Sequence, residues 1–318
     1  MDPPRRIQNL GLMKKTPLIS DIQGNSLDDG PGIRSLIFFK GCPLSCRWCQ
    51  NPESKNPDPE LAFDAQKCVA CDSCMEKCPE GALSRDNVYF VDRARCTLCF
   101  ECVKVCPSGA LSRAGREYTV EEVTAAVAKD QPFYEASGGG VTLSGGEPTM
   151  HLEFLSGLLA ALKNKGIHTL IETCGWFNFD QFQESALPFT DAVYLDIKLF
   201  DADEHQRYCG VDNQVILENF IKLHELSLSR QLEIVARVPL IPDITDREHN
   251  LEAIARFFRE HGVKQIRLLP NNPTWHPKCL ALGYESPFGE DSPMRKWLPP
   301  EKMEACRNIF LANSLMVV

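Results

Sequence analysis

Three cysteines in the stretch KGCPLSCRWCQNPES are the first residues whose type and spacing could do chemistry. Cys42, Cys46 and Cys49 follow the spacing C-x3-C-x2-C, and the same loop contains no fourth cysteine and no histidine. Three thiolates can hold three irons of a four-iron cluster and leave the fourth iron open, and an open coordination position is typical of a catalytic metal. A zinc loop completed by a distant ligand is the alternative.

Eight further cysteines lie in two copies of one motif, CVACDSCMEKCP from Cys68 and CTLCFECVKVCP from Cys96. Each copy reads C-x2-C-x2-C-x3-C-P, which resembles the ligand run of bacterial two-cluster ferredoxins, in which the fourth cysteine binds the other cluster. The motif predicts two [4Fe-4S] clusters, with two zinc sites as the alternative. The predicted ligands are Cys68, Cys71, Cys74 and Cys106 for one cluster, and Cys78, Cys96, Cys99 and Cys102 for the other.

The composition is that of a globular protein with many cysteines. The 318 residues are 43% hydrophobic and carry a formal net charge of -9, which disfavours binding to nucleic acid or to an anionic membrane. The apolar runs are too short to cross a bilayer, and the first residues lack the apolar core of a secretory signal, so we expect a cytoplasmic protein. Fifteen cysteines in that compartment favour metal ligands over disulfides.

Strand and helix patterns alternate along most of the chain, and they predict how these residues are positioned. The strand patterns are SLIFFKG, GVTLSG, HTLIET, AVYLDIKL, LEIVARVPL and KQIRLLP. Alternation with helices predicts parallel strands, and six units are too few to close an eight-stranded barrel. We therefore expect an α/β fold: an open, partial (β/α)6 barrel from residues 1–52 and 114–318, with a two-[4Fe-4S] ferredoxin-like domain inserted at residues 53–113.

Polar and glycine residues follow or end these strands, where barrel folds place their catalytic groups. Asp196 and Lys198 alternate with Ile197, so both side chains lie on one face of the fourth strand. A structural ion pair between the two is the alternative. In strand order, the candidate residues are Cys42, Gly145, Glu172, Asp196 with Lys198, and Arg237.

The motifs, taken together and in this order, resemble the activating enzymes of glycyl radical enzymes, which belong to the radical S-adenosylmethionine (SAM) superfamily. Besides the cysteine loop they are DGPGIR, SGGEP, LIETCGW, YLDIKLFD and HQRYCGVDN. The pyruvate formate-lyase activating enzyme is the familiar member of this family. A subgroup carries a two-cluster ferredoxin insert directly after the C-x3-C-x2-C loop. The resemblance implies a partial barrel that cleaves SAM reductively to a 5'-deoxyadenosyl radical. That radical would remove a hydrogen atom from a glycine of a partner enzyme.

The same resemblance implies roles for individual residues. It assigns the cluster that binds SAM to Cys42, Cys46 and Cys49, and the amino group of SAM to Gly145 and Gly146, with Glu147 in the same ligand site. Glu172 and Thr173 would lie beside the SAM carboxylate and a monovalent cation, and Arg237 would face the adenosyl group. Asp196 and Lys198 would contact SAM and the substrate peptide, and Asp29 would contact the docked peptide. The family often has a histidine near the ribose after LLP, but this chain reads LLPNNPTWHPKC. Asn271, Asn272 and His276 are the candidates to replace it.

The cofactors implied are three [4Fe-4S] clusters, SAM and a monovalent cation. The partners implied are a glycyl radical enzyme and an electron donor such as ferredoxin or flavodoxin, and we expect a monomer that binds neither nucleic acid nor membrane. The insert would either relay electrons or dock a partner.

The alternatives are another radical SAM enzyme that modifies proteins, such as a sulfatase maturase, an iron–sulfur electron-transfer protein, and a zinc-binding interaction protein. The isolated Cys174, Cys209, Cys279 and Cys306 are predicted to be small buried residues.

Overall fold

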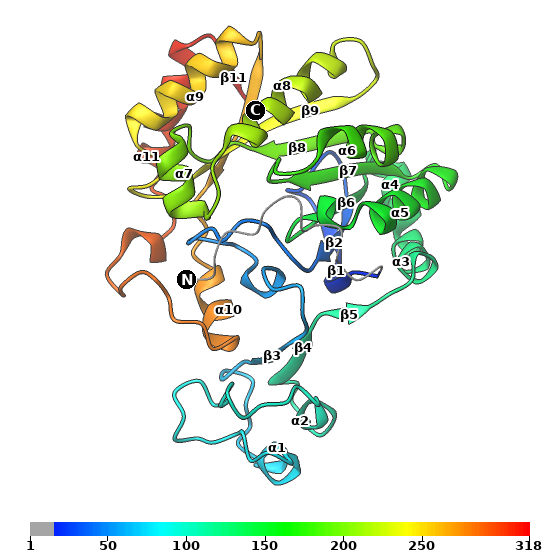
Figure 1. Ribbon diagram of the computed structural model, residues 1–318, viewed down its shortest axis with the longest axis vertical. Coiled ribbons are helices and arrows are strands. Elements are labelled where there is room, and N and C mark those ends of the chain that lie inside the picture. Colours follow the sequence, from blue (N-terminus) through cyan, green and yellow to red (C-terminus); the bar gives the residue numbers. More distant parts are fainter. Residues whose placement is uncertain (1–15) are drawn as a thin grey trace.

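A nine-stranded mixed sheet is the centre of residues 16–318, the part of the chain that the computed structural model describes (Figure 1). Its strand order is β11-β10-β9-β8-β7-β6-β2-β1-β5, so β11 and β5 are its open edges. The six strands predicted from the sequence lie side by side and parallel, which confirms the α/β fold. They are β2 (Arg34–Phe39), β6 (Gly140–Gly145), β7 (His168–Thr173), β8 (Ala192–Asp196), β9 (Glu233–Leu240) and β10 (Gln265–Pro270).

Three strands of this sheet were not predicted. β1 (Leu18–Ser26) pairs antiparallel with β2, β5 (Arg116–Glu117) pairs antiparallel with β1, and β11 (Met316–Val317) pairs parallel with β10. Only the first two residues of β1, Leu18 and Ile19, are buried, and the pairing with β2 has two register shifts. The apolar alternation of a half-buried strand is therefore missing, and the other two strands are too short to show a pattern.

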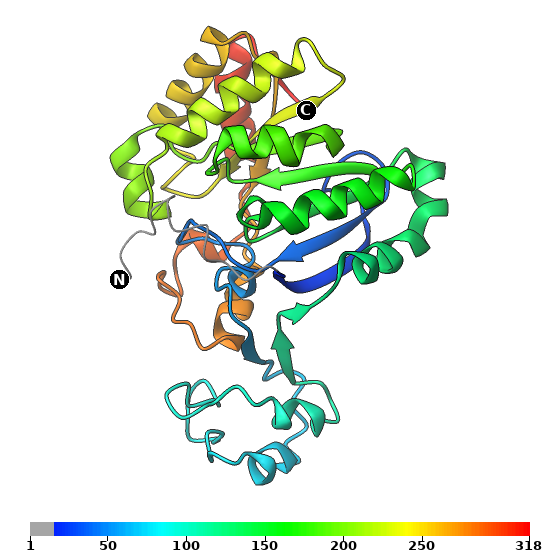
Figure 2. The same cartoon turned by 45° about the vertical axis from the view of Figure 1, so that its right-hand side comes forward.

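Helices connect the parallel strands and cover the sheet (Figure 2). α5 shows why they form: its apolar residues recur at helical spacing, and Leu155, Leu158, Leu159 and Leu162 are all fully buried in the core. The helices of this part are α3 (Val120–Val127), α4 (Gln131–Ser137), α5 (Leu152–Asn164), α6 (Phe179–Ser185), α7 (Ala202–Cys209), α8 (Gln214–Ser227), α9 (Glu248–Glu260), α10 (Trp275–Ala281) and α11 (Pro300–Ala312). None of the helices in residues 16–318 is long and apolar enough to cross a membrane.

The segment with the two cysteine repeats lies away from the large sheet, at the bottom of Figures 1 and 2. It contains the antiparallel pair β3 (Glu60–Phe63) and β4 (Leu111–Ala114) and the short helices α1 (Ser73–Lys77) and α2 (Glu101–Lys104). A second, smaller hydrophobic core fills it, and Leu61, Phe90 and Leu111 are among its buried residues. An inserted domain needs a hydrophobic core of its own. The boundaries of the insert, residues 53 and 113, stay a prediction.

A buried ion pair attaches this segment to the large sheet. Lys40, which follows β2, is fully buried, and its Nζ lies 2.8 Å from Oε2 of Glu60, the first residue of β3. Tyr284 donates a hydrogen bond to the other carboxylate oxygen of Glu60. Arg93 donates to the carbonyl oxygens of Leu61 at 2.5 Å and Ala281 at 3.2 Å. The segment is thus held between the end of β2 and the region after α10.

Candidate active site

One large cavity of about 520 Å³ opens at the carboxyl ends of the parallel strands. This volume lies in the range of about 300–1,000 Å³ that is usual for cofactor and small-molecule sites. Ten of the eleven residues that the sequence predicted for the SAM site line the cavity. They are Cys42, Cys46, Cys49, Gly145, Gly146, Glu172, Thr173, Asp196, Lys198 and Arg237.

The loop with the first three cysteines is fixed by backbone hydrogen bonds. The N–H of Cys42 donates to the carbonyl of Lys55 at 3.2 Å, and the N–H of Ser45 donates to the carbonyl of Cys209 at 2.7 Å. Burial, followed by the nearby Cys46 and Cys42, raises the pKa of Cys49 to about 12. Three thiols of one loop that line the same cavity are a donor set that fits an iron–sulfur cluster, which binds such groups as thiolates.

Gly145 and Gly146 are required by a close approach of two backbones. Gly145 has φ of +104°, and a Cβ at this position would lie 2.5 Å from the N atom of Phe39. A Cβ on Gly146 would lie 2.2 Å from the carbonyl oxygen of Gly41. A side chain on Gly145 would therefore push β2 away from β6, and one on Gly146 would push away Gly41, where the cysteine loop begins.

Glu147 does not point into the cavity, contrary to the prediction for this residue. Its fully buried carboxylate accepts hydrogen bonds from the N–H and the hydroxyl of Thr149, from the hydroxyl of Thr173 at 2.8 Å and from the N–H of Cys174 at 2.7 Å. The carboxylate is thus used to connect the turn after β6 with the end of β7. The motif SGGEP alone does not reveal in which direction its glutamate points.

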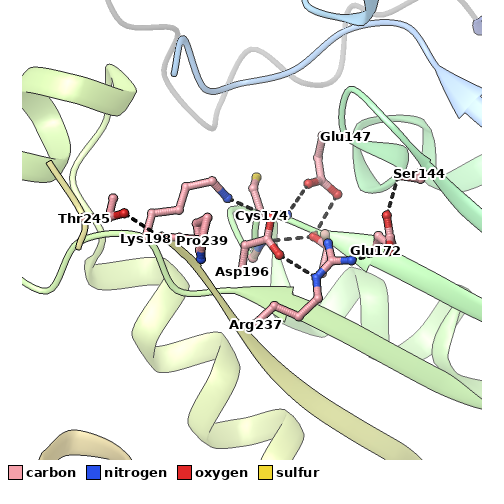
Figure 3. A network of polar contacts seen from close by, with 11 residues as sticks. Ser144, Glu147, Glu172, Cys174, Asp196, Lys198, Arg237, Pro239 and Thr245 are labelled. Carbon is pink, nitrogen blue, oxygen red and sulfur yellow. Dashed lines mark hydrogen bonds and ion pairs between the residues drawn. The ribbon is translucent and has the colours of Figure 1, made fainter. Parts of the chain in front are cut away.

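A network of buried charges forms one wall of the cavity (Figure 3). Arg237 Nε lies 2.7 Å from Asp196 Oδ1, and Arg237 Nη1 contacts Glu172 Oε1. Lys198 Nζ lies 3.1 Å from Asp196 Oδ2, and Ser144 donates a hydrogen bond of 2.6 Å to Glu172. The predicted alternative, an ion pair between Asp196 and Lys198, is thus present, and Arg237 extends it across β7, β8 and β9.

The network shifts the pKa values of Asp196 and Glu172 in opposite directions. Burial acts to raise the pKa of Asp196, but the charges of Arg237 and Lys198 outweigh it and leave this pKa below its usual value. Burial raises the pKa of Glu172, and the charge of Arg237 only partly offsets it. Opposite shifts in neighbouring acids are typical of functional sites, because such sites bury charges that an ordinary surface would solvate.

The predicted cation site finds no free ligand in this arrangement. The carboxylate of Glu172 is engaged by Arg237 and Ser144, and the hydroxyl of Thr173 donates to Glu147. Both residues still line the cavity, where their remaining surfaces face the space available to a cofactor. The monovalent cation therefore stays a prediction.

The region after β10 contributes Asn272 to the cavity. The other two candidates for the ribose contact serve the protein itself. Asn271 is fully buried and its side-chain amide donates to the carbonyl of Lys296 at 2.8 Å, while His276 Nε2 lies 3.1 Å from the carbonyl oxygen of Met294 and its ring stacks on Trp275. Asn272 is thus the one of the three candidates that lines the cavity, and its contact with the ribose stays a prediction.

The eight cysteines of the repeats gather around two small cavities. One cavity is lined by Cys68, Cys71, Cys74 and Cys106, together with Phe63 and Phe90. The other is lined by Cys78, Cys96, Cys99 and Cys102, together with Leu61 and Leu83. Each set combines three cysteines of one repeat with the fourth of the other, as the ferredoxin-like motif predicts. Four thiols around one cavity fit a [4Fe-4S] cluster, and the number of clusters stays a prediction.

Several residues of the large cavity were missed in the sequence. Asp21 and Gln23 lie on β1, the strand that had no clear pattern, and Asp28 follows it beside the predicted Asp29. Lys55 and Lys278 line the cavity near the cysteine loop. For Lys55, the one feature in the sequence that could have indicated this position is that it directly follows the motif NPES. The isolated Cys174, Cys209, Cys279 and Cys306 are buried, as predicted.

The parallel sheet and the cysteine loop together define a class of protein, and the sequence comparison names it. Residues 36–258 match the radical SAM superfamily. The chain is 42% identical over 283 residues to the isethionate sulfite-lyase activating enzyme of Nitratidesulfovibrio vulgaris, covering 87% of this chain and 91% of the relative. It is 37% identical to the choline trimethylamine-lyase activating enzyme of Oleidesulfovibrio alaskensis, covering 93% and 96% of the two chains.

A third relative serves another reaction. The trans-4-hydroxy-L-proline dehydratase activating enzyme of Clostridioides difficile is 37% identical over 302 residues, which are 94% of this chain and 97% of the relative. The chain belongs to the radical SAM superfamily and, within it, to the activating enzymes of glycyl radical enzymes. The protein is therefore a radical SAM enzyme. The relatives favour activation of a glycyl radical enzyme over the alternatives of a sulfatase maturase-like enzyme, an electron carrier or a zinc protein.

Proposed function

We propose that the large cavity binds SAM beside a [4Fe-4S] cluster on Cys42, Cys46 and Cys49, and that the enzyme uses it to generate a glycyl radical in a partner enzyme. When bound and reduced, the cluster supplies the electron that splits the SAM sulfonium into methionine and a 5'-deoxyadenosyl radical. The observation that carries this proposal is the convergence of three thiols and the buried charge network on one cavity.

The protein residues have binding and positioning roles in this proposal. Gly145 and Gly146 would hold the methionyl end of SAM, and Asn272, which lines the same cavity, would contact the ribose. Lys198 and Asp196 provide opposite charges for the carboxylate and the ammonium group of SAM, and Arg237 holds Asp196 in place. Because these charges are buried and held in place by their partners, they would orient the cofactor without first having to rearrange.

The test is direct formation of a glycyl radical. The reconstituted enzyme is incubated without oxygen with SAM, dithionite and one candidate partner, and the sample is examined by electron paramagnetic resonance (EPR). The expected result is a glycyl doublet in one partner, together with 5'-deoxyadenosine and methionine. The control omits SAM. If no member of a broad panel gives a doublet and no 5'-deoxyadenosine forms, the proposal is wrong.

The panel follows from the relatives. It contains isethionate sulfite-lyase, choline trimethylamine-lyase and trans-4-hydroxy-L-proline dehydratase, because the activating enzymes named for these three proteins are the relatives described above. We infer that one glycyl radical enzyme of this kind is the partner. We also infer that the electron donor is a ferredoxin or a flavodoxin, and that the chain is a monomer.

We propose that residues 53–113 are a ferredoxin-like insert with two [4Fe-4S] clusters. Its own hydrophobic core and the two cavities lined by four cysteines each support the proposal. Both cavities contain apolar residues beside the thiols, which suits a cluster that the protein shields from water. The insert would bring the total to three clusters.

A variant that lacks one cysteine ligand of the insert distinguishes the clusters of the insert from the cluster that binds SAM. For Cys71→Ser, we expect the iron content to fall from about twelve to about eight atoms per chain, because one [4Fe-4S] cluster is lost. SAM cleavage driven by dithionite should persist, since Cys71 lies in the small cavity and not in the large one. Iron and sulfide analysis measures the first effect, and chromatography of 5'-deoxyadenosine the second. Zinc without sulfide in the wild-type protein would contradict the cluster assignment.

A further inference from the structure

Four cationic side chains line the large cavity, and they differ in what balances their charge. They are Lys55, Lys198, Arg237 and Lys278. Lys198 pairs with Asp196, Arg237 pairs with both Asp196 and Glu172, and Lys278 pairs with Glu53. Lys55 takes part in none of the ion pairs formed among residues 16–318. Its charge is thus available to a group that enters the cavity.

The carboxylate closest to Lys55 in the sequence does not neutralise it. Glu53 gives its Oε1 to Lys278 at 2.8 Å, while its Oε2 is buried and has no hydrogen-bond partner among the described residues. Lys278 is also held by the carbonyl of Gln50 and the side chain of Asn51, both at 3.2 Å. The ammonium of Lys278 is therefore bound by three protein groups, whereas that of Lys55 has no hydrogen-bond partner among the described residues.

The backbone fixes Lys55 beside the cysteine loop. The N–H of Lys55 donates to the carbonyl of Pro52 at 3.2 Å, and its carbonyl accepts from the N–H of Cys42 at 3.2 Å. The side chain enters the cavity that the thiols of Cys42, Cys46 and Cys49 also line. Lys55 and the three thiols therefore lie on the same cavity, and the backbone of Lys55 is bonded directly to that of Cys42.

We propose that Lys55 is a positioning residue that supplies the counter-charge for the anionic group held by Cys42, Cys46 and Cys49; this inference rests on the proposed function. Each added electron makes a thiolate-bound cluster more negative. A fixed cation in a partly buried cavity stabilises that reduced form more than a cation in water would. Lys55 thus makes the reduced state of the SAM cluster easier to reach, without touching the reacting atoms.

The test compares charge with shape in the complete, reconstituted enzyme. Lys55→Met removes the charge, Lys55→Gln removes it but keeps a polar side chain, and Lys55→Arg keeps it. The midpoint potential is measured by redox titration, using the part of the reduced EPR spectrum that changes when SAM is added, because only the SAM cluster responds to the cofactor. We expect a more negative potential for the two neutral variants and a potential near the wild-type value for Lys55→Arg.

A control corrects for net charge. Lys165→Met makes the same change of charge on an exposed residue that precedes β7, at the opposite end of the sheet, and should leave the potential unchanged. An unchanged potential in Lys55→Met would overturn the inference. If the neutral variants lose iron while Lys55→Arg keeps it, the counter-charge is needed already for assembly, which supports the inference. Loss of iron in Lys55→Arg as well would overturn it, because shape would then matter instead of charge.

Measurements on the same samples distinguish a failure of the proposed function from a failure of the role proposed for Lys55. If the wild-type spectrum does not change on addition of SAM, the proposed function fails, whatever the variants do. If the wild-type spectrum changes and the potentials of the wild type and Lys55→Met coincide, only the role of Lys55 fails.

Discussion

Serine in place of Cys46 abolishes the formation of 5'-deoxyadenosine from SAM. Cys46 lines the large cavity with Cys42 and Cys49, and two cysteines with one serine no longer provide three thiolates for the cluster. We expect a loss of at least about a thousandfold in rate, which corresponds to about 4 kcal/mol in the barrier. Iron should fall by about four atoms per chain, while the two clusters proposed for the insert remain. Product analysis with dithionite as reductant measures the rate.

The matched control for this variant is Cys306→Ser. Cys306 is buried, even more fully than Cys46, but it lies on α11 and lines none of the three cavities described above. Its variant should keep the full iron content and the activity, with at most a modest loss of thermal stability. Full activity of Cys46→Ser, with unchanged iron, would show that the cysteine loop is not the cluster site.

Replacement of Arg237 by methionine lowers the free energy of unfolding by about 3–5 kcal/mol, the usual cost of removing one partner from a buried ion pair. The guanidinium contacts Glu172 and Asp196, and the side chains of all three are at most 20% exposed. Without it, Lys198 and Ser144 alone remain to compensate two buried carboxylates. Urea unfolding of the reconstituted protein, followed by tryptophan fluorescence, measures the change.

The loss in Arg237→Met should depend on pH. Burial already raises the pKa of Glu172 in the wild type, and removal of the positive charge raises it further. A carboxyl group whose pKa is higher in the folded state binds its proton more tightly there. The free energy of unfolding therefore falls as the pH rises from the unfolded pKa of about 4.3 through the folded pKa. The variant should lose more stability relative to the wild type at pH 7 than at pH 5, which lies close to the unfolded pKa.

A surface arginine is the control for both measurements. Arg259 lies on the exposed face of α9 and contacts the side chain of Asn313 at 3.1 Å. Arg259→Met should change the free energy of unfolding by less than about 0.5 kcal/mol at either pH. An equally small effect of Arg237→Met would mean that the charges of Glu172 and Asp196 are solvated and that the network contributes nothing to stability.

The parallel part of the fold could be predicted because its pattern is local. Each parallel strand is a short apolar run followed by a helix with period 3.6, and the crossover rule then arranges the strands. β1 escaped prediction because only Leu18 and Ile19 are buried in it, so its presence depends on pairing with β2. β5 and β11 consist of two residues each and exist only because a neighbouring strand offers free hydrogen-bonding groups.

The members of the site could be predicted better than their contacts. Strand order brings the carboxyl ends together, which is why the position of Glu172 and Arg237 on one cavity followed from the sequence. That these two residues pair with each other depends on distances across three strands and is not visible in any motif. For the same reason the direction of Glu147 was wrong: its partners Thr149, Thr173 and Cys174 come from two different turns.

The attachment of the small segment also bears on how such a chain could change in evolution. Glu60 and Ala114 are opposite each other in the β3–β4 pair, so the chain enters and leaves the small segment at neighbouring points. An exchange of the residues between them for a hairpin or another module would keep these two ends in place and would lose the hydrogen bond from Arg93 to Ala281. One demand survives any such exchange: the buried ammonium of Lys40 needs an acidic partner, so Glu60 must be kept at the point where the module begins.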